Sequence, residues 1–349
     1  SSTLISGNFA YSSYTTSLKE SSGKPRKSSI DGFNGGLDFN YFLGDDEIKY
    51  GVDILGFKTA FSFVNGSNLK LEQESFTTEI AGYFKYKFVS GSWVIEPSIR
   101  GHYYASLEEL SPEPRLGIKY ILSDHLRLKL AGGMFSQNLV SATSDRDVVN
   151  LFYGFLSAPE SLPKTFNGND VTSALQKAQH LIVGTEYDFP YNISFNIEGY
   201  VKYFNQLTTL NRDKIYNDNL YTTKLPDRLK KDFIIETGIS KGIDATLKYE
   251  NQRLYLWFVY SLGFSTRTDG VINYNPHYDR RHNINMVSSY RFGKKKSWEV
   301  DFRWNFGSGF PFTQTQGYFE QNNFNNGTNT NYINSNGSLG ASYASLNGA

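Results

Sequence analysis

The sequence predicts an all-β protein, an antiparallel transmembrane β-barrel of the outer-membrane type with about thirteen visible strands. Three observations lead to this prediction. Oily and polar side chains alternate along extended segments, short and long connections alternate between those segments, and no run of about 18 apolar residues exists for a membrane helix. Because side chains on a strand point to opposite faces with a period of two, each segment has one apolar and one wet face.

The alternation is clearest in the last of these segments, residues 297–308. We expect one parity of this segment to face lipid, namely Trp298, Val300, Phe302, Trp304 and Phe306. The other parity is charged and belongs to a set that we expect to line the lumen: Lys85, Lys87, Arg127, Lys129, Glu299, Asp301 and Arg303. Except for Arg303, the basic members come from earlier strands and the acidic ones from the last strand. A basic wall that faces a mixed acidic wall could hold a polar plug or guide a hydrated solute, and the alternative is simple solvation of a wide lumen.

Thirteen segments show this alternation, with bounds good to about 2–4 residues. They are 4–17, 28–43, 46–62, 71–89, 93–105, 114–122, 126–137, 178–189, 191–205, 234–250, 252–265, 281–292 and 297–308. A soluble β-sandwich is the alternative that alternates in the same way, but its strands are usually about 5–6 residues long. Several segments here exceed a dozen residues, so their length favours strands that cross a membrane.

The connections between the segments alternate strictly in length. Short turns lie at 44–46, 90–92, 123–125, 190, 251 and 293–297, and longer polar links lie at 18–28, 63–70, 106–113, 138–177, 206–233, 266–280 and 309–349. If every strand reverses direction, all short turns fall at one end of the sheet and all long links at the other. Outer-membrane barrels have this asymmetry, with short periplasmic turns and long external loops.

The composition argues against several classes of function. The 35 basic and 34 acidic residues nearly cancel, so the overall charge gives no reason to expect a nucleic-acid partner. The absence of cysteine excludes a disulfide scaffold, a zinc–thiolate site and a cysteine nucleophile. The five histidines have no compact metal-ligand spacing, and no nucleophile elbow or phosphate-binding glycine loop is present. We therefore expect neither enzyme activity nor a cofactor.

The long links are where we expect ligand contacts. Within 138–177, the candidates are Phe152, Tyr153 and Phe155, which we expect to form an exposed aromatic cluster. Asp145 is placed to cap a short helix that would run through Phe152 and Phe155.

A second candidate pair lies before the strand that begins near residue 281. Arg280 and Arg281 follow Asp279, and at the external mouth of a barrel they could contact a ligand. The competing interpretation is that two arginines beside an aspartate are simply solvated and paired with it.

The chain divides into two parts by composition. Residues 1–312 form the barrel portion, and residues 313–349 form a tail rich in Asn, Gly and Ser. Because the tail contains no alternating segment, we expect it to be a loop or linker without a strand.

Several motifs in the second half of the chain resemble the C-terminal barrel of TonB-dependent outer-membrane receptors, especially those of Bacteroidetes-type bacteria. They are Tyr278-Asp-Arg-Arg-His282, Tyr290-Arg-Phe-Gly293 and Trp304-Asn-Phe-Gly-Ser-Gly-Phe-Pro311, with weaker similarity in Gln176-Lys-Ala-Gln-His180 and Gly242-Ile-Asp-Ala-Thr-Leu247. The resemblance covers about 176–315 well and the rest only through the barrel pattern.

This resemblance implies a location in the bacterial outer membrane and the import of a scarce solute such as a chelated metal, cobalamin, a glycan or a peptide. It also implies a barrel of about 22 strands around a plug domain that contacts TonB in the periplasm. This sequence shows about thirteen strands and neither a plug nor a TonB-contacting segment. We therefore expect part of a larger barrel, whose plug belongs to the same protein or to a separate one.

Two alternatives stay open beside import. A receptor-like barrel could serve as a structural subunit that docks other outer-membrane subunits through its loops, or it could be a passive pore. Outer-membrane lipid is the partner that all three functions share.

Overall fold

The computed structural model describes residues 2–19, 26–65, 69–142, 152–321 and 338–348. Within them, thirteen long strands form one sheet in which each strand pairs with the next long strand of the chain. The pairings are antiparallel throughout. These strands are β1 (Ser2–Leu18), β2 (Arg26–Leu43), β3 (Asp46–Val64), β4 (Lys70–Ser90), β5 (Trp93–Tyr104), β6 (Glu109–Ile121), β7 (Leu126–Gln137), β12 (Gln176–Phe189), β13 (Ile193–Leu210), β14 (Phe233–Glu250), β15 (Leu254–Thr268), β17 (His282–Phe292) and β18 (Trp298–Gly307).

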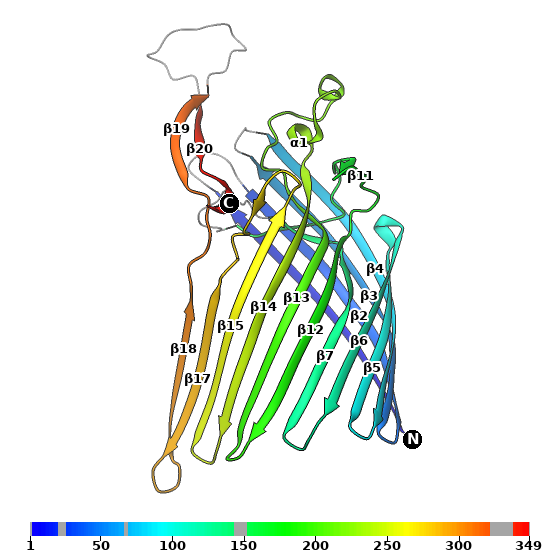
Figure 1. Cartoon of the computed structure of the whole chain (residues 1–349). Coiled ribbons are helices and arrows are strands. Elements are labelled where there is room, and N and C mark those ends of the chain that lie inside the picture. The colour runs from blue at the N-terminus through cyan, green and yellow to red at the C-terminus, as the bar shows by residue number, and fades with distance from the viewer. Residues whose placement is uncertain (1, 20–25, 66–68, 143–151, 322–337, 349) are drawn as a thin grey trace.

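The predicted set of strands is confirmed, and so is the alternation of short and long connections. All short turns lie at the lower end of the sheet in Figure 1, and the long links lie at the upper end. Glycines with left-handed backbone close two of the short turns, Gly44 with φ +64° and Gly293 with φ +92°. The largest differences from the predicted bounds are at the long-link end, where β13 continues to Leu210 and β6 already begins at Glu109.

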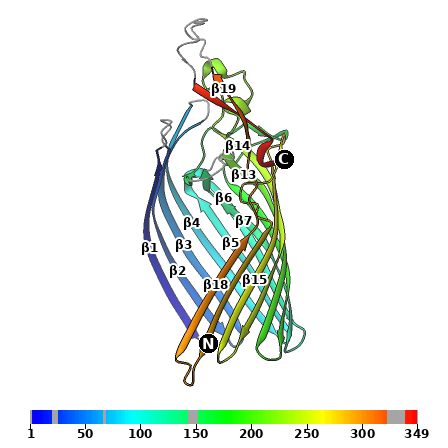
Figure 2. The ribbon, with the colours of Figure 1, turned by 90° about the vertical axis from the view of Figure 1, so that its left-hand side faces the viewer.

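The sheet curls strongly, so that β1 to β4 lie behind β12 to β15 in Figure 1, and Figure 2 looks into the concave side between β1 and β18. Within the described residues, β1 and β18 pair on one side only, and neither pairs with the other. Nearly every residue of both strands is exposed, whichever face it is on. The curled sheet is therefore open along these two edges.

The remaining elements lie in the long links. They are η1 (Ala105–Leu107), β8 (Leu139–Ala142), β9 (Gly154–Ser157), β10 (Thr165–Phe166), β11 (Asn169–Asp170), η2 (Leu220–Thr222), α1 (Asp227–Lys230), β16 (Asn273–Tyr274), β19 (Thr315–Gln321), β20 (Ser338–Tyr343) and η4 (Leu346–Gly348). No helix in the described part of the chain has the length and hydropathy to cross a membrane.

The tail differs from its prediction, because it contains a pair of strands. β19 and β20 form an antiparallel hairpin at the upper left of Figure 1. The chain then returns to the sheet, where the Asn347 N–H donates to Thr313 Oγ1 at 3.0 Å and the Asn347 side-chain amide donates to the carbonyl oxygen of Asn275 at 2.9 Å. Both Thr313 and Asn347 are buried, so the segment after β20 is docked. The short strands escaped notice because their sequence does not alternate.

The register assigns the predicted lipid and lumen residues to opposite faces. Partners in neighbouring strands share a face, and an unbroken row runs from Arg127 through Glu186, Asn196, Thr246, Val259 and Asn285 to Asn305. By parity along β18, Glu299, Asp301 and Arg303 share the face of Arg127, and Trp298 to Phe306 in steps of two lie on the other. The two faces are therefore separated as expected, and contact of the apolar face with lipid stays a prediction.

The predicted separation of basic and acidic walls is wrong. Basic residues of the wet face pair with acidic residues one or two strands away, as in Lys85 Nζ to Glu96 Oε2 at 2.8 Å and Lys129 Nζ to Glu198 Oε1 at 2.8 Å. Arg127 lies against both Glu186 and Asp188. Sequence order misled here because acidic residues of nearby strands pair with Lys85, Arg127 and Lys129.

Candidate functional site

A hairpin from the link between β7 and β12 folds into the concave side of the sheet at its upper end. Its strands β8 and β9 pair antiparallel. β9 contacts β2, β3 and β4, whereas β8 contacts β13, which is far from them along the sheet. A segment that touches both sides of a curled sheet must cross its concave face. We call residues 139–142 and 152–157 the internal hairpin.

Buried hydroxyl groups anchor the internal hairpin to the wet face of β2, β3 and β4. The N–H of Phe155 donates to Ser28 Oγ at 2.9 Å. Thr77 Oγ1 donates to Ser157 Oγ at 2.8 Å, and Thr59 Oγ1 lies 3.0 Å from the same oxygen. Because these side chains are buried, each bond satisfies a polar atom that water does not reach. The bonds also show that the wet face of the sheet is its concave face.

A small apolar core forms where the internal hairpin meets the sheet. Its members are Phe61, Leu71, Val140, Ala142, Phe152, Leu156, Leu210 and Phe233. Phe152 is only 3% exposed and its ring centroid lies 6.3 Å from that of Phe61. The predicted exposed aromatic cluster is therefore wrong for Phe152, because β3 carries apolar residues on its concave face near the upper end and the hairpin covers them.

The other two residues of that predicted cluster separate. Phe155 lies in β9, so the predicted helix does not extend to it, and its ring meets the Tyr14 ring edge-on at 6.1 Å between centroids. The predicted cap Asp145 lies outside the described residues. Tyr153 is 49% exposed and lines a cavity, which is the placement expected for a ligand-contacting residue.

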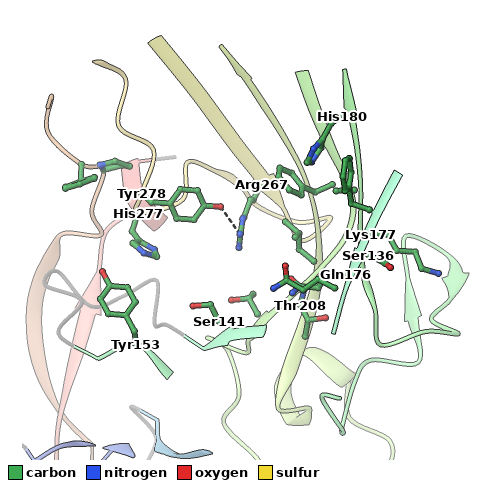
Figure 3. A pocket seen from close by; sticks show the side chains of 18 of the residues that line it. Ser136, Ser141, Tyr153, Gln176, Lys177, His180, Thr208, Arg267, His277 and Tyr278 are labelled. Carbon is green, nitrogen blue, oxygen red and sulfur yellow. Dashed lines mark hydrogen bonds between the residues drawn. The ribbon is translucent and has the colours of Figure 1, made fainter. Parts of the chain in front are cut away.

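The cavity lies beside the internal hairpin at the upper end of the concave face and has a volume of about 1070 Å³ (Figure 3). Its walls come from the upper ends of β7, β12, β13 and β15, the link that follows β15, the segment after β18 and the internal hairpin. Six aromatic side chains line it: Phe135, Tyr153, Phe204, Tyr278, Phe310 and Phe312. This size and apolar lining are typical of small-molecule sites, which hold about 300–1,000 Å³.

The ionisable residues that line the cavity are basic or phenolic. Lys177, His180, Arg267 and His277 line it, and no aspartate or glutamate does in the described part of the chain. Arg267 points into the cavity opposite Tyr278, and its Nη2 donates to the Tyr278 hydroxyl at 2.8 Å (Figure 3). Lys177 Nζ lies 2.8 Å from Glu109 Oε1, outside the lining.

Behind Arg267, a buried ionic cluster ties two long links to the tops of β14 and β15. Glu236 of β14 is 0% exposed and accepts from Arg212 Nη1 at 2.9 Å and from the Tyr274 hydroxyl at 2.9 Å. Arg267 Nη1 lies 3.5 Å from the other oxygen of Glu236. Arg212 also donates to Asp269 at 2.5 Å. The cluster therefore fixes the wall that presents Arg267.

The charge state of Asp269 follows from its surroundings in the link after β15. Burial by itself would raise the pKa of its carboxyl, but the N–H groups of Ile272 and Val271 and the charges of Arg212 and Arg228 outweigh burial. The pKa of Asp269 is therefore held below its ordinary value of 3.8.

The two predicted arginines have different environments. Arg281 Nη2 lies 3.0 Å from Asp279, and its guanidinium stacks over Phe264, which agrees with the interpretation of local pairing. The Arg280 guanidinium stacks over the ring of Phe310, a lining residue of the cavity, at 4.1 Å. Contact of either arginine with a ligand stays a prediction.

The sequence patterns do not mark the residues that form most of the cavity, among them Arg267, Lys177 and His277. Each lies at the upper end of a strand or in a link, where the alternation of residues fades, and nothing local distinguishes it from other wet-face residues. No group of three or more histidine, aspartate and glutamate side chains in the described ranges could hold a metal ion.

Comparisons with known proteins report similarity in structure only. No family model and no curated protein matches the sequence. The ferric citrate transporter FecA in its unliganded form matches with a TM-score of 0.51 and 14% identity, over 90% of this chain and 46% of that one. The FrpB iron transporter from Neisseria meningitidis (F3-3 variant) matches with a TM-score of 0.56 and 11% identity, over 86% of this chain and 47% of that one.

The copper transporter OprC matches with a TM-score of 0.52 and 11% identity, over 87% of this chain and 49% of that one. The chain thus spans about half the length of these structures. Identities this low show the fold alone. The chain therefore shares the fold of these transporter structures, and its all-β class, with one large antiparallel sheet of the barrel type, is confirmed.

Proposed function

We propose that this chain is the barrel portion of a TonB-dependent outer-membrane receptor that imports a scarce solute, with the cavity beside the internal hairpin as the place of capture. The observation that carries the proposal is the position of this cavity. It lies on the concave face at the end of the sheet with the long links, which is the external end in barrels of this kind.

The direction of the strands supports a larger barrel. β1 and β18 both run from the short-turn end to the long-link end, so pairing them with each other would be parallel. An antiparallel barrel that contains this sheet needs an odd number of further strands between these edges. Closure is required in a membrane, because each backbone group left unsatisfied in lipid costs several kcal/mol. The sequence resemblance implies about 22 strands in total, which is about nine more.

The partners follow from the same proposal. A plug domain would fill the concave side, and TonB would act on that plug from the periplasm. The ion-paired wet face offers such a plug a polar surface with little net charge, through pairs such as Lys85 with Glu96 and Lys129 with Glu198. Outer-membrane lipid would cover the opposite face.

The proposal is tested in the source bacterium with deletions of this gene and of the gene for TonB. When the imported solute limits growth, we expect each deletion to slow growth. The growth rate of the double deletion should then be no lower than that of either single deletion. Additive defects would contradict energised import.

A pair of alanine variants tests the cavity itself. Ala178 lines the cavity, so Ala178→Trp should fill it and reproduce the growth defect of the deletion. Ala245 of β14 shares a face with Ile197, away from the cavity, and Ala245→Trp should leave growth unchanged at the same amount of protein in the membrane. Equal growth of the two strains would exclude this cavity as the capture site.

Two further measurements address the alternatives. A steady open conductance of the purified receptor in planar bilayers would favour a passive pore. Recovery in a stoichiometric outer-membrane complex, with no growth defect on deletion, would favour a structural subunit.

A further inference from the structure

The charges around the cavity indicate the chemical class of its ligand. Four of the lining residues have basic side chains, namely Lys177, His180, Arg267 and His277, and no aspartate or glutamate of the described residues lines the cavity. Lys177 pairs with Glu109 and Arg267 with Glu236, both outside the lining. We propose that the cavity binds an organic anion that carries a flat apolar ring, with the anionic group at Arg267. This inference rests on the proposed function, since it names the solute that the receptor would capture.

Arg267 is held in position for such an anion. Its Nη1 lies 3.5 Å from Glu236, which is fully buried, and its Nη2 donates to the exposed Tyr278 hydroxyl at 2.8 Å. A planar guanidinium matches a carboxylate with two parallel hydrogen bonds, and a charged acceptor binds more strongly than a neutral one. An incoming carboxylate therefore replaces the phenol oxygen, and Glu236 keeps the guanidinium oriented while this happens.

The aromatic side chains that line the cavity suit a flat ring. The rings of Phe135 and His180 are stacked with centroids 4.4 Å apart, and the Phe204 ring meets His180 edge-on at 6.4 Å. Phe310 and Phe312, each 53% exposed, add two more rings, and the Arg280 guanidinium covers one face of Phe310. Offset and edge-on packing against such rings favours a planar ligand beyond the area that it buries.

The same groups disfavour other solutes. A cationic ligand would meet the guanidinium of Arg267 and would find no carboxylate among the described lining residues. A neutral glycan could stack on the aromatic rings but would gain nothing from the positive charge. The choice between an anion and a neutral molecule is therefore the measurement that decides the inference.

The experiment compares three probes of nearly equal shape. Binding of 1-naphthoate, 1-naphthamide and 1-naphthylmethylamine to the purified full-length receptor in neutral detergent is measured by equilibrium dialysis, with empty micelles subtracted. We expect 1-naphthoate to bind at least about tenfold more tightly than the amide, and the amine to bind most weakly. Acetate, which lacks a ring, should bind far more weakly than 1-naphthoate.

Two arginine variants locate the anion. Arg267→Gln should abolish the preference for the carboxylate over the amide while the amide still binds. Arg291→Gln is the matched control, because Arg291 pairs with Glu299 at the short-turn end of β17, far from the cavity lining, so it should keep the preference. Because Arg267→Gln can also loosen the ionic cluster, the comparison of probes on the unaltered receptor stands as an independent test.

The outcomes separate this inference from the proposed function. Equal binding of the carboxylate and the amide, or no measurable binding of any probe, overturns the anionic class. A preference that survives Arg267→Gln, or is lost in Arg291→Gln, overturns the role of Arg267. In each of these cases import is still decided by the growth experiments, which do not depend on the ligand's charge.

Discussion

Glu236→Gln should release the two long links above β14 and β15 without unfolding the barrel. Glutamine keeps the shape of the side chain and a hydrogen bond with Tyr274, but it removes the negative charge shared by Arg212 and Arg267. Arg212 is only 5% exposed, so its charge would then rely mainly on Asp269. Breaking a buried ion pair by removing one partner costs about 3–5 kcal/mol.

This cost corresponds to a change of about two to three and a half orders of magnitude in the equilibrium for local opening. Hydrogen exchange measured by mass spectrometry reports that equilibrium at individual segments. Good reporters are the N–H of Asn211, bonded to Asp232 at 2.9 Å, and the N–H of Ile215, bonded to Leu229 at 3.0 Å. Both should exchange faster, while amides in β4 keep their protection.

Glu250→Gln is a matched control on the same strand. Glu250 pairs with Lys248 at 2.9 Å, and the two side chains are 59% and 46% exposed, so solvent screens the pair. Such pairs contribute about 0–1 kcal/mol, and exchange in the links should not change measurably. If the two variants leave exchange in the links equally unchanged, the ionic cluster does not hold them in place, and the reasoning is wrong.

Three further predictions concern other parts of the molecule. Phe302→Arg should destabilise the inserted barrel by about 2–4 kcal/mol in a refolding assay if that face meets mid-bilayer lipid. Arg303→Ala, on the other face, should cost little. Equal stability of the two variants would refute the assignment of faces. The pKa of Asp269 is lowered in the folded state, so its ionised carboxylate stabilises the folded links above pH 3.8. This contribution is lost as the pH falls through the lowered pKa, and hydrogen exchange in the links should accelerate only in that acid range. Loss of protection already between pH 5 and 7 would contradict this origin. Ser28→Ala, which leaves the hairpin N–H without its acceptor, should cost about 1–3 kcal/mol and speed exchange in the internal hairpin, whereas Ser13→Ala at an exposed site should not.

The sheet was predictable because its signal is local and repeated. Alternation with a period of two fixes which side chains of a strand share a face, and turn residues such as Gly44 and Gly293 mark where the chain reverses. The strand set and the order of short and long connections were therefore correct. Errors gathered at the long-link end, where β13 extends beyond its predicted end to Leu210 and the alternation is weak.

The candidate site was much less predictable. Tyr153 was identified because aromatic residues stand out in a polar link, but Phe152 beside it is buried against Phe61 of β3. Nothing in the local sequence distinguishes the two residues. Arg267 and Glu236 were missed for the same reason, since each resembles any charged residue on a wet strand face.

The sequence by itself determined that this chain forms long antiparallel strands with one oily and one wet face, because that information lies within each strand. Only the tertiary structure decided that the internal hairpin crosses the wet face and that Arg267 lines a cavity backed by a buried carboxylate. Those features depend on contacts between residues far apart in the chain. Such contacts follow from register and curvature rather than from the pattern of any single segment.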